Sequence, residues 1–202
     1  MQLRKEEYKK FNFIKEPTEG FNLTPFEGFQ RLTMLDRYSL KDTSLETLKE
    51  GDVVLTIVKE HPQYPTMGYG VVMWEEYGEV GIKIDFPDYM AGQEIIKPLN
   101  AIDKPLELYW EQIAYRVAKA IASVKNPEKQ DKVFNDFYWM LSEQYYIPGG
   151  RILYGAGNPA NVTLFNCFSL GTIPDSRGGI IDHIKTATEI MSRGGGVGSC
   201  IS

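Results

Sequence analysis

The 202-residue chain is long enough for one or two domains with an apolar core, and its 43% hydrophobic, 12% aromatic and 24% charged residues are typical of a soluble globular protein. No apolar run approaches the ~20 residues of a membrane span, and the charged N-terminus excludes a signal peptide. The formal net charge of −5 argues against nucleic-acid binding, although backbone N–H groups can still bind the phosphates of a nucleotide. Two cysteines without a framework pattern indicate a reducing cytoplasm.

Residues 1–48 form the first of four predicted regions. Prolines and glycines interrupt it, so no long element is expected. A short helix is predicted within FEGFQRLTMLDRYSLKD (26–42), where Phe29, Leu32 and Leu35 have helical spacing. We interpret this region as an arm that packs on the body of the protein.

Residues 49–104 are predicted to form a small β module. Short β-branched runs, separated by Gly, Pro and Asp, indicate four or five strands, with a hairpin turn at EYGEV (76–80). Their even spacing suggests an SH3-like barrel. The acidic loops favour a docking or spacer module over a nucleic-acid reader; they contain Glu75, Glu76, Glu79, Asp85 and Asp88. His61, in a Pro-bounded loop, is expected to be solvated rather than a ligand.

Residues 105–146 are predicted to be helical. Pro105 suits the first turn of a helix whose apolar face carries Leu108, Ile113, Val117, Ala120 and Ile121. Asn126-Pro127 indicates a break. A second helix follows, with a core stripe of Val133, Phe137, Met140 and Leu141.

Residues 147–202 carry four motifs that point to chemistry. In chain order they are PGGRILYGAG (148–157), read as a turn, a short strand and a turn; NCFSL (166–170), inside a strand with Cys167 near its middle; PDS (174–176), before a helix; and GGGVG (194–198), which ends that helix. Three consecutive glycines are expected to expose backbone N–H groups to a ligand. A Rossmann loop is excluded because its glycines precede the helix.

The order of these motifs resembles the large subunit of ribonucleotide reductase, and more closely its adenosylcobalamin-dependent class II branch. The resemblance implies an α+β fold in which a small SH3-like β module and helices precede the first strands and helix of a ten-stranded α/β barrel. Many reductases have Ser-Pro-Thr where this chain has Gly150-Arg151-Ile152, so no substrate contact is expected from Ile152.

The resemblance also implies roles for particular residues. Cys167 would be one half of a redox thiol pair, and it would line the ribonucleotide site with Asn166, Gly195 and Gly196. Asp175, Ser176 and Arg177 would contact a dNTP or ATP effector that sets substrate specificity, while Asp175 and Ser176 are also good helix N-caps.

The helix after Ser176 has an apolar face of Ile180, Ile181, Ile184, Ala187 and Ile190, and the resemblance implies that it forms a dimer contact. His183 is expected on its outer face or at that contact. No metal site is predicted.

A reductase also needs a radical-bearing cysteine, a second redox thiol and a cobalamin surface, and these motifs do not occur here. We therefore expect an N-terminal portion that is inactive alone, completed by a C-terminal reductase polypeptide and regenerated by a thioredoxin-type reductant. The alternatives are a truncated product, or a segment that ends at an intein beginning with Cys200. A different class of hypothesis is a non-catalytic docking module built on the β region.

Overall fold

The computed structural model describes residues 26–200 except 43 and 161, so most of the predicted N-terminal arm lies outside the described residues. The described part begins with helix α2 (Gly28–Thr33), which continues into the π-helical turn η1 (Met34–Tyr38) and the short strand β1 (Lys41–Asp42). The predicted helix is therefore confirmed. Leu32 and Leu35 are buried as its spacing predicts, whereas Phe29 is exposed.

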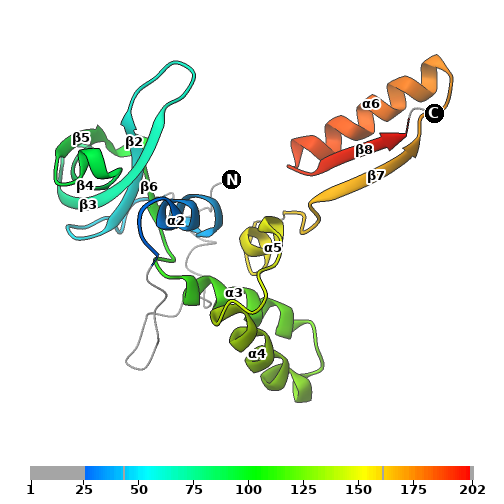
Figure 1. Cartoon of the computed structure of the whole chain (residues 1–202), viewed down its shortest axis with the longest axis horizontal. Helices are drawn as coiled ribbons and strands as arrows, with labels where there is room; N and C mark the ends of the chain where they lie inside the picture. Colours follow the sequence, from blue (N-terminus) through cyan, green and yellow to red (C-terminus); the bar gives the residue numbers. More distant parts are fainter. Residues whose placement is uncertain (1–25, 43, 161, 201–202) are drawn as a thin grey trace.

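The predicted strands are also confirmed. They are β2 (Val53–Lys59), β3 (Thr66–Glu76), β4 (Glu79–Phe86), β5 (Glu94–Pro98) and β6 (Ile102–Pro105), with single 3-10 turns η2 (Asp88–Met90) and η3 (Leu99–Ala101) beside β5. They form an antiparallel sheet in the order β1-β6-β2-β3-β4-β5 (Figure 1). Closure of this sheet into an SH3-like barrel stays a prediction.

Alternating side chains of the sheet build one apolar core. Its fully buried members are Val54, Val72, Val80, Ile82 and Ile84, which come from three consecutive strands. The predicted turn between β3 and β4 has positive φ at Tyr77 (52°) and Gly78 (80°), as a two-residue hairpin turn with right-handed twist requires. The exposed His61 accepts hydrogen bonds from the N–H groups of Gln63 and Tyr64, so it organises its own loop.

Two helices that pack against each other follow, α3 (Trp110–Ser123) and α4 (Pro127–Ser142). The prediction that Pro105 opens the first helix is wrong, because Pro105 is the last residue of β6. The helix begins at Trp110, where Gln112 Oε1 accepts from the N–H groups of Leu108 (2.7 Å) and Tyr109 (3.1 Å). The predicted break is confirmed, with Pro127 as the first residue of α4.

A second core joins these helices to the N-terminal segment and the sheet. It contains Ile113, Ala114, Val117 and Ala118 of α3, together with Leu35, Leu55, Tyr69, Leu141 and Leu153. Of the stripe predicted on α4, only Leu141 is fully buried. Trp110 fixes the helix pair, since its indole N–H donates to the carbonyl of Leu141 at 2.7 Å.

The predicted strand RILY is in fact helix α5 (Gly150–Gly155). A short apolar run has no periodicity of its own that separates helix from strand. Helical spacing puts Leu153 and Ala156 on one side, and both are buried in the second core. Burial against the α3 side therefore selected the helix.

The last elements form a parallel β-α-β unit: β7 (Cys167–Thr172), α6 (Arg177–Ser192) and β8 (Gly196–Cys200). Figure 1 shows this unit extending away from the sheet and the other helices, with α6 alongside the two strands. Cys167 is the first residue of its strand rather than near the middle, and it is exposed.

Candidate functional site

The pairing of β7 with β8 brings the predicted substrate residues together. Cys167 lies opposite Gly196 in the parallel register, and the N–H of Gly196 donates to the carbonyl of Asn166 at 2.8 Å. A Cβ atom at position 196 would lie 3.4 Å from Cys167 Sγ. The cysteine and the glycine turn are therefore neighbours at the amino ends of both strands.

The backbone N–H groups of the glycine turn are already used. Gly194 donates to Met191 O, Gly195 to Ile190 O and Gly196 to Asn166 O. The expectation that this turn exposes its amides to a ligand is therefore wrong for this conformation. The glycines serve close packing instead: a Cβ at Gly195 would lie 2.7 Å from Ile190 and 2.8 Å from Phe168.

Arg151 connects α5 to this turn. Its guanidinium donates to the carbonyl of Gly194, and its backbone N–H donates to Asn166 Oδ1 at 3.4 Å. Gly194 has φ of +79° and its Cα lies against that guanidinium, so the close approach requires a residue without a side chain. Arg151 thus bridges the predicted substrate residues and the helical body.

Two cavities share Arg151 and Tyr154. The first, of about 600 Å³, lies between η1 and α5 and is also lined by Arg37, Tyr38 and Asn166. The second, of about 800 Å³, lies between α5 and the end of α6, where Thr163, Ser192 and Arg193 contribute. Polar and cationic side chains from separate segments therefore converge beside the β7–β8 pair.

The predicted effector residues lie at the opposite end of β7. Ser176 precedes α6 and its Oγ accepts from the N–H of Gly179 at 3.0 Å, which confirms the predicted N-cap. Asp175 and Arg177 flank it and are exposed. The structure does not bring these three residues together with Cys167.

Neither Cys167 nor Cys200 is in a disulfide, and both are exposed. Cys200 pairs with Thr172, whereas Cys167 pairs with Gly196. Four residues of extended strand separate the two levels by about 13 Å, well beyond the ~7 Å that a disulfide allows between Cα atoms. Cys200 is therefore not positioned as a redox partner of Cys167.

His183 lies toward the strands and not on the outer face of α6. Its Nε2 is 2.7 Å from Ser199 Oγ of β8. The apolar residues Ile180, Ile181 and Ile184 are exposed instead, and none of α6 is fully buried. Among the described residues, no group of His, Cys, Asp and Glu side chains has the arrangement of a metal site.

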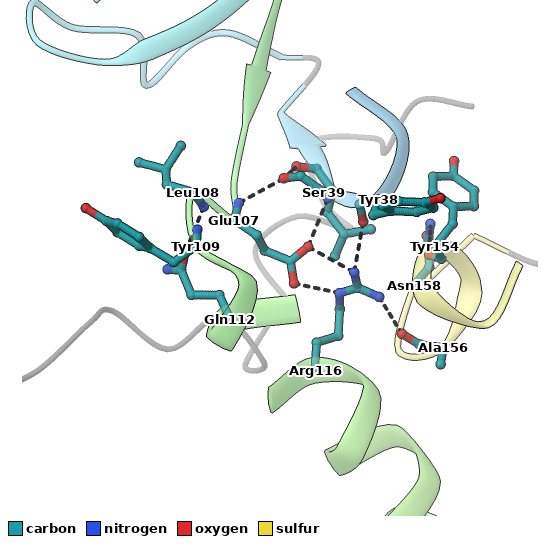
Figure 2. Close-up of polar contacts among 11 residues, drawn as sticks. Tyr38, Ser39, Glu107, Leu108, Tyr109, Gln112, Arg116, Tyr154, Ala156 and Asn158 are labelled. Atoms are coloured by element: carbon teal, nitrogen blue, oxygen red, sulfur yellow. Dashed lines mark hydrogen bonds and ion pairs between the residues drawn. The ribbon is translucent and has the colours of Figure 1, made fainter. Parts of the chain in front are cut away.

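A buried ion pair behind α5 was not predicted. The Arg116 guanidinium contacts both carboxylate oxygens of Glu107, at 2.7 and 3.0 Å, and both side chains are fully buried. Figure 2 shows the network around it: Arg116 also donates to the carbonyls of Tyr38 and Ala156. Glu107 accepts from the N–H of Leu40, and its own N–H donates to Ser39 Oγ. The sequence signal is slight, since Arg116 falls between apolar residues of α3.

Residues 99–161 match the family model described as ribonucleotide reductase, all-alpha domain. This match supports the large-subunit family of ribonucleotide reductases. The matched segment contains α3, α4 and α5, with Arg116 and Arg151, and it suggests an oxidoreductase of ribonucleotide reduction. No curated protein matches the chain. No helix in the described part of the chain is long and apolar enough to span a membrane.

Proposed function

We propose that the chain contributes a redox cysteine, part of the substrate site and the effector-specificity site to a class II ribonucleotide reductase. The observation that carries the proposal is the pairing of Cys167 with Gly196, which follows directly after the segment that matches the reductase domain. Because Gly196 has no side chain next to the Cys167 sulfur, a ribose has room to approach the thiol.

The proposed chemistry is the reduction of a ribonucleotide. The C2′–O bond breaks and a C2′–H bond forms, while two thiols supply two electrons and two protons and become a disulfide. One proton goes to C2′ and the other to the departing hydroxyl, which leaves as water. Cys167 is one of these thiols, and its exposure allows access. The second thiol comes from a C-terminal reductase polypeptide, because Cys200 is too far along β8. A thioredoxin-type dithiol then reduces the disulfide.

The effector is a dNTP or ATP held beside the start of α6. Ser176 already caps the helix, and the positive end of the helix dipole lies there. Asp175 is suited to accept from a sugar hydroxyl, and Arg177 to pair with phosphate. These exposed side chains lie away from Cys167, as an allosteric rather than a catalytic role requires.

The β7–α6–β8 unit supports the need for further polypeptide. Parallel strands are normally covered on both faces, and a two-stranded sheet is marginal alone. Most residues of β7 and β8 are exposed, as are Ile180, Ile181 and Ile184 on α6. We propose that strands of the C-terminal polypeptide extend this sheet and that α6 packs against α6 of a second copy.

Adenosylcobalamin is the proposed radical source, because the sequence PGGRIL (148–153) resembles that of class II reductases. The two described cavities of about 600 and 800 Å³ have the size of sites for smaller ligands and polar, charged walls. The described residues do not fit a corrin, so we assign none of them to it and place the cofactor with the C-terminal polypeptide.

Effector binding to the chain mixed with its candidate C-terminal polypeptide tests the specificity site. Asp175→Ala should weaken dNTP binding about tenfold, as expected for loss of a hydrogen bond to a charged group. Asp136→Ala, an exposed carboxylate on α4, is the matched control and should leave affinity unchanged. Equal affinity of Asp175→Ala and wild type would contradict the effector assignment.

Turnover in the same mixture tests the redox role. Cys167→Ser should abolish multiple turnover with a dithiol reductant while nucleotide binding is retained, whereas Cys200→Ser should turn over normally. Retained turnover in Cys167→Ser would contradict the redox assignment. A docking-module function predicts instead that neither variant changes the interaction of the β module with its partner, and that no nucleotide binds.

A further inference from the structure

The cavity between η1 and α5 has the composition of an anion site. Two arginines from separate segments, Arg37 and Arg151, line it together with the side chains of Tyr38, Tyr154 and Asn166. Tyr38 comes from η1 and Tyr154 from α5 (Figure 2). The chain has a formal net charge of −5, so two arginines in one cavity wall make a region of positive charge on a negatively charged protein.

Asp36, the acidic member of the cavity wall, offsets part of this charge and leaves N–H groups of Arg37 for a ligand. Asp36 is shared by two cations, with Oδ1 at 3.2 Å from Lys41 Nζ and Oδ2 at 3.2 Å from Arg37 Nε. Lys41 also pairs with Asp103. The Arg37 side chain is 74% exposed, and one Nε contact leaves the other guanidinium N–H groups for a ligand.

Arg151 is held in place and still retains donors. One terminal nitrogen donates to the carbonyl of Gly194, and its backbone is fixed by Asn166. A guanidinium has five N–H groups in a planar fork, which suits two oxygens of a phosphate. Beyond the contact with Gly194, the guanidinium keeps further N–H groups for a ligand.

We propose that this cavity binds the phosphate chain of a nucleotide through Arg37 and Arg151, with the two tyrosine hydroxyls and the Asn166 amide as neutral partners. The inference deepens the proposed function and rests on it for the identity of the nucleotide. The N–H groups of residues 194–196 donate within the chain, so they are not available to a phosphate. In this proposal, side chains on α5 and η1 bind the phosphate instead.

The second cavity provides an internal comparison. It shares Arg151 and Tyr154, but its other arginine is Arg193, which pairs with Glu189 at 3.3 Å on the exposed surface of α6. Replacing Arg193 removes the same charge from a neighbouring site. The two cavities are therefore distinguished by Arg37 on one side and Arg193 on the other.

Titration of the purified chain with inorganic tripolyphosphate, followed by calorimetry at low salt, tests the site without any nucleoside. Arg37→Gln and Arg151→Gln should each weaken binding about tenfold or more, the usual cost of losing a charge-assisted hydrogen bond. Arg151→Lys should fall between them and the wild type, because a point charge replaces the fork. Arg193→Gln and Lys132→Gln, with the same loss of charge, should stay within about twofold.

Absence of tripolyphosphate binding to the wild-type chain would overturn the proposal, as would an equal loss in Arg193→Gln and Arg37→Gln. If circular dichroism shows that Arg151→Gln is unfolded, the tripolyphosphate affinity of the exposed Arg37→Gln variant tests the proposal instead. A nucleoside triphosphate should bind more tightly than tripolyphosphate. Equal affinities, with both still dependent on Arg37, would uphold the anion site and contradict the nucleotide function proposed above.

Discussion

The buried ion pair of Glu107 and Arg116 carries a desolvation cost. Both side chains are removed from water, and desolvation of two charges cancels much of their attraction. The network makes the arrangement tolerable, since the carboxylate accepts three N–H groups and the guanidinium reaches two further carbonyls. The pair specifies how three segments meet more than it stabilises the fold.

Removal of one partner should therefore be far worse than removal of both. Glu107→Leu leaves the Arg116 charge buried and should lower the free energy of unfolding by about 3–5 kcal/mol, measured by urea denaturation. The double variant Glu107→Leu/Arg116→Met should recover most of that loss. Glu60→Gln, which opens the exposed pair with Lys97, is the control and should cost no more than about 1 kcal/mol. Additive losses in the double variant would contradict this account.

Tyr138 should make stability fall at high pH. Burial, followed by the nearby carboxylates of Glu111 and Glu143, raises the pKa of Tyr138 to about 12 from 10.0. Since the folded state holds this proton more tightly than the unfolded state, its contribution is complete below pH 10 and is lost as the pH rises toward 12. The unfolding free energy of the wild type should therefore decline more steeply over that interval than that of Tyr138→Phe. Parallel pH curves for the two proteins would refute the raised pKa.

At the scale of elements, the β3–β4 hairpin has a residue poorly suited to its turn. Tyr77 is fully exposed and adopts φ of +52°, a region that favours Asn and Gly. Tyr77→Asn should raise the midpoint of thermal unfolding by about 2–4 °C, because the Asn-Gly pair matches the turn. Gly78→Ala, at φ of +80°, should lower it. A lower midpoint for Tyr77→Asn would show that the ring contributes something the turn geometry does not.

The sequence predicted the elements whose pattern is local and missed those selected by distant contacts. The strands from Val53 to Phe86 follow from the periodicity of their apolar residues. The N-cap at Ser176 follows from the serine hydroxyl alone. Helix α5 was mistaken for a strand because only burial of Leu153 against α3 decides between them. The glycine turn was identified, but its hydrogen bonds to Ile190, Met191 and Asn166 arise from the ends of α6 and the start of β7. The Glu107–Arg116 pair joins residues whose partners lie up to 78 positions away.

At the scale of the molecule, the β7–α6–β8 unit has little that holds it to the body. Its residues are mostly exposed, and Arg151 of α5 links to it through hydrogen bonds to Asn166 and to the carbonyl of Gly194. Amide hydrogen exchange of the isolated chain should therefore be fast across α6 and β8 and slow in β2, β3 and β4, whose side chains form a buried core. Addition of the proposed C-terminal polypeptide should slow exchange in the unit. Strong protection of α6 in the monomeric chain would contradict the need for a partner.

The Glu107–Arg116 network also decides where the chain can be divided. The segment that matches the reductase domain begins at residue 99, yet the hydrogen-bond partners of its buried charges include Tyr38, Ser39 and Leu40. Its apolar interior likewise includes Leu35, Leu55 and Tyr69. An excised fragment 99–161 would expose this interior to water. It would also leave Glu107 and Arg116 without their hydrogen-bond partners in residues 38–40. The smallest autonomous folding unit around the matched segment therefore starts before η1 and carries the whole β module with it.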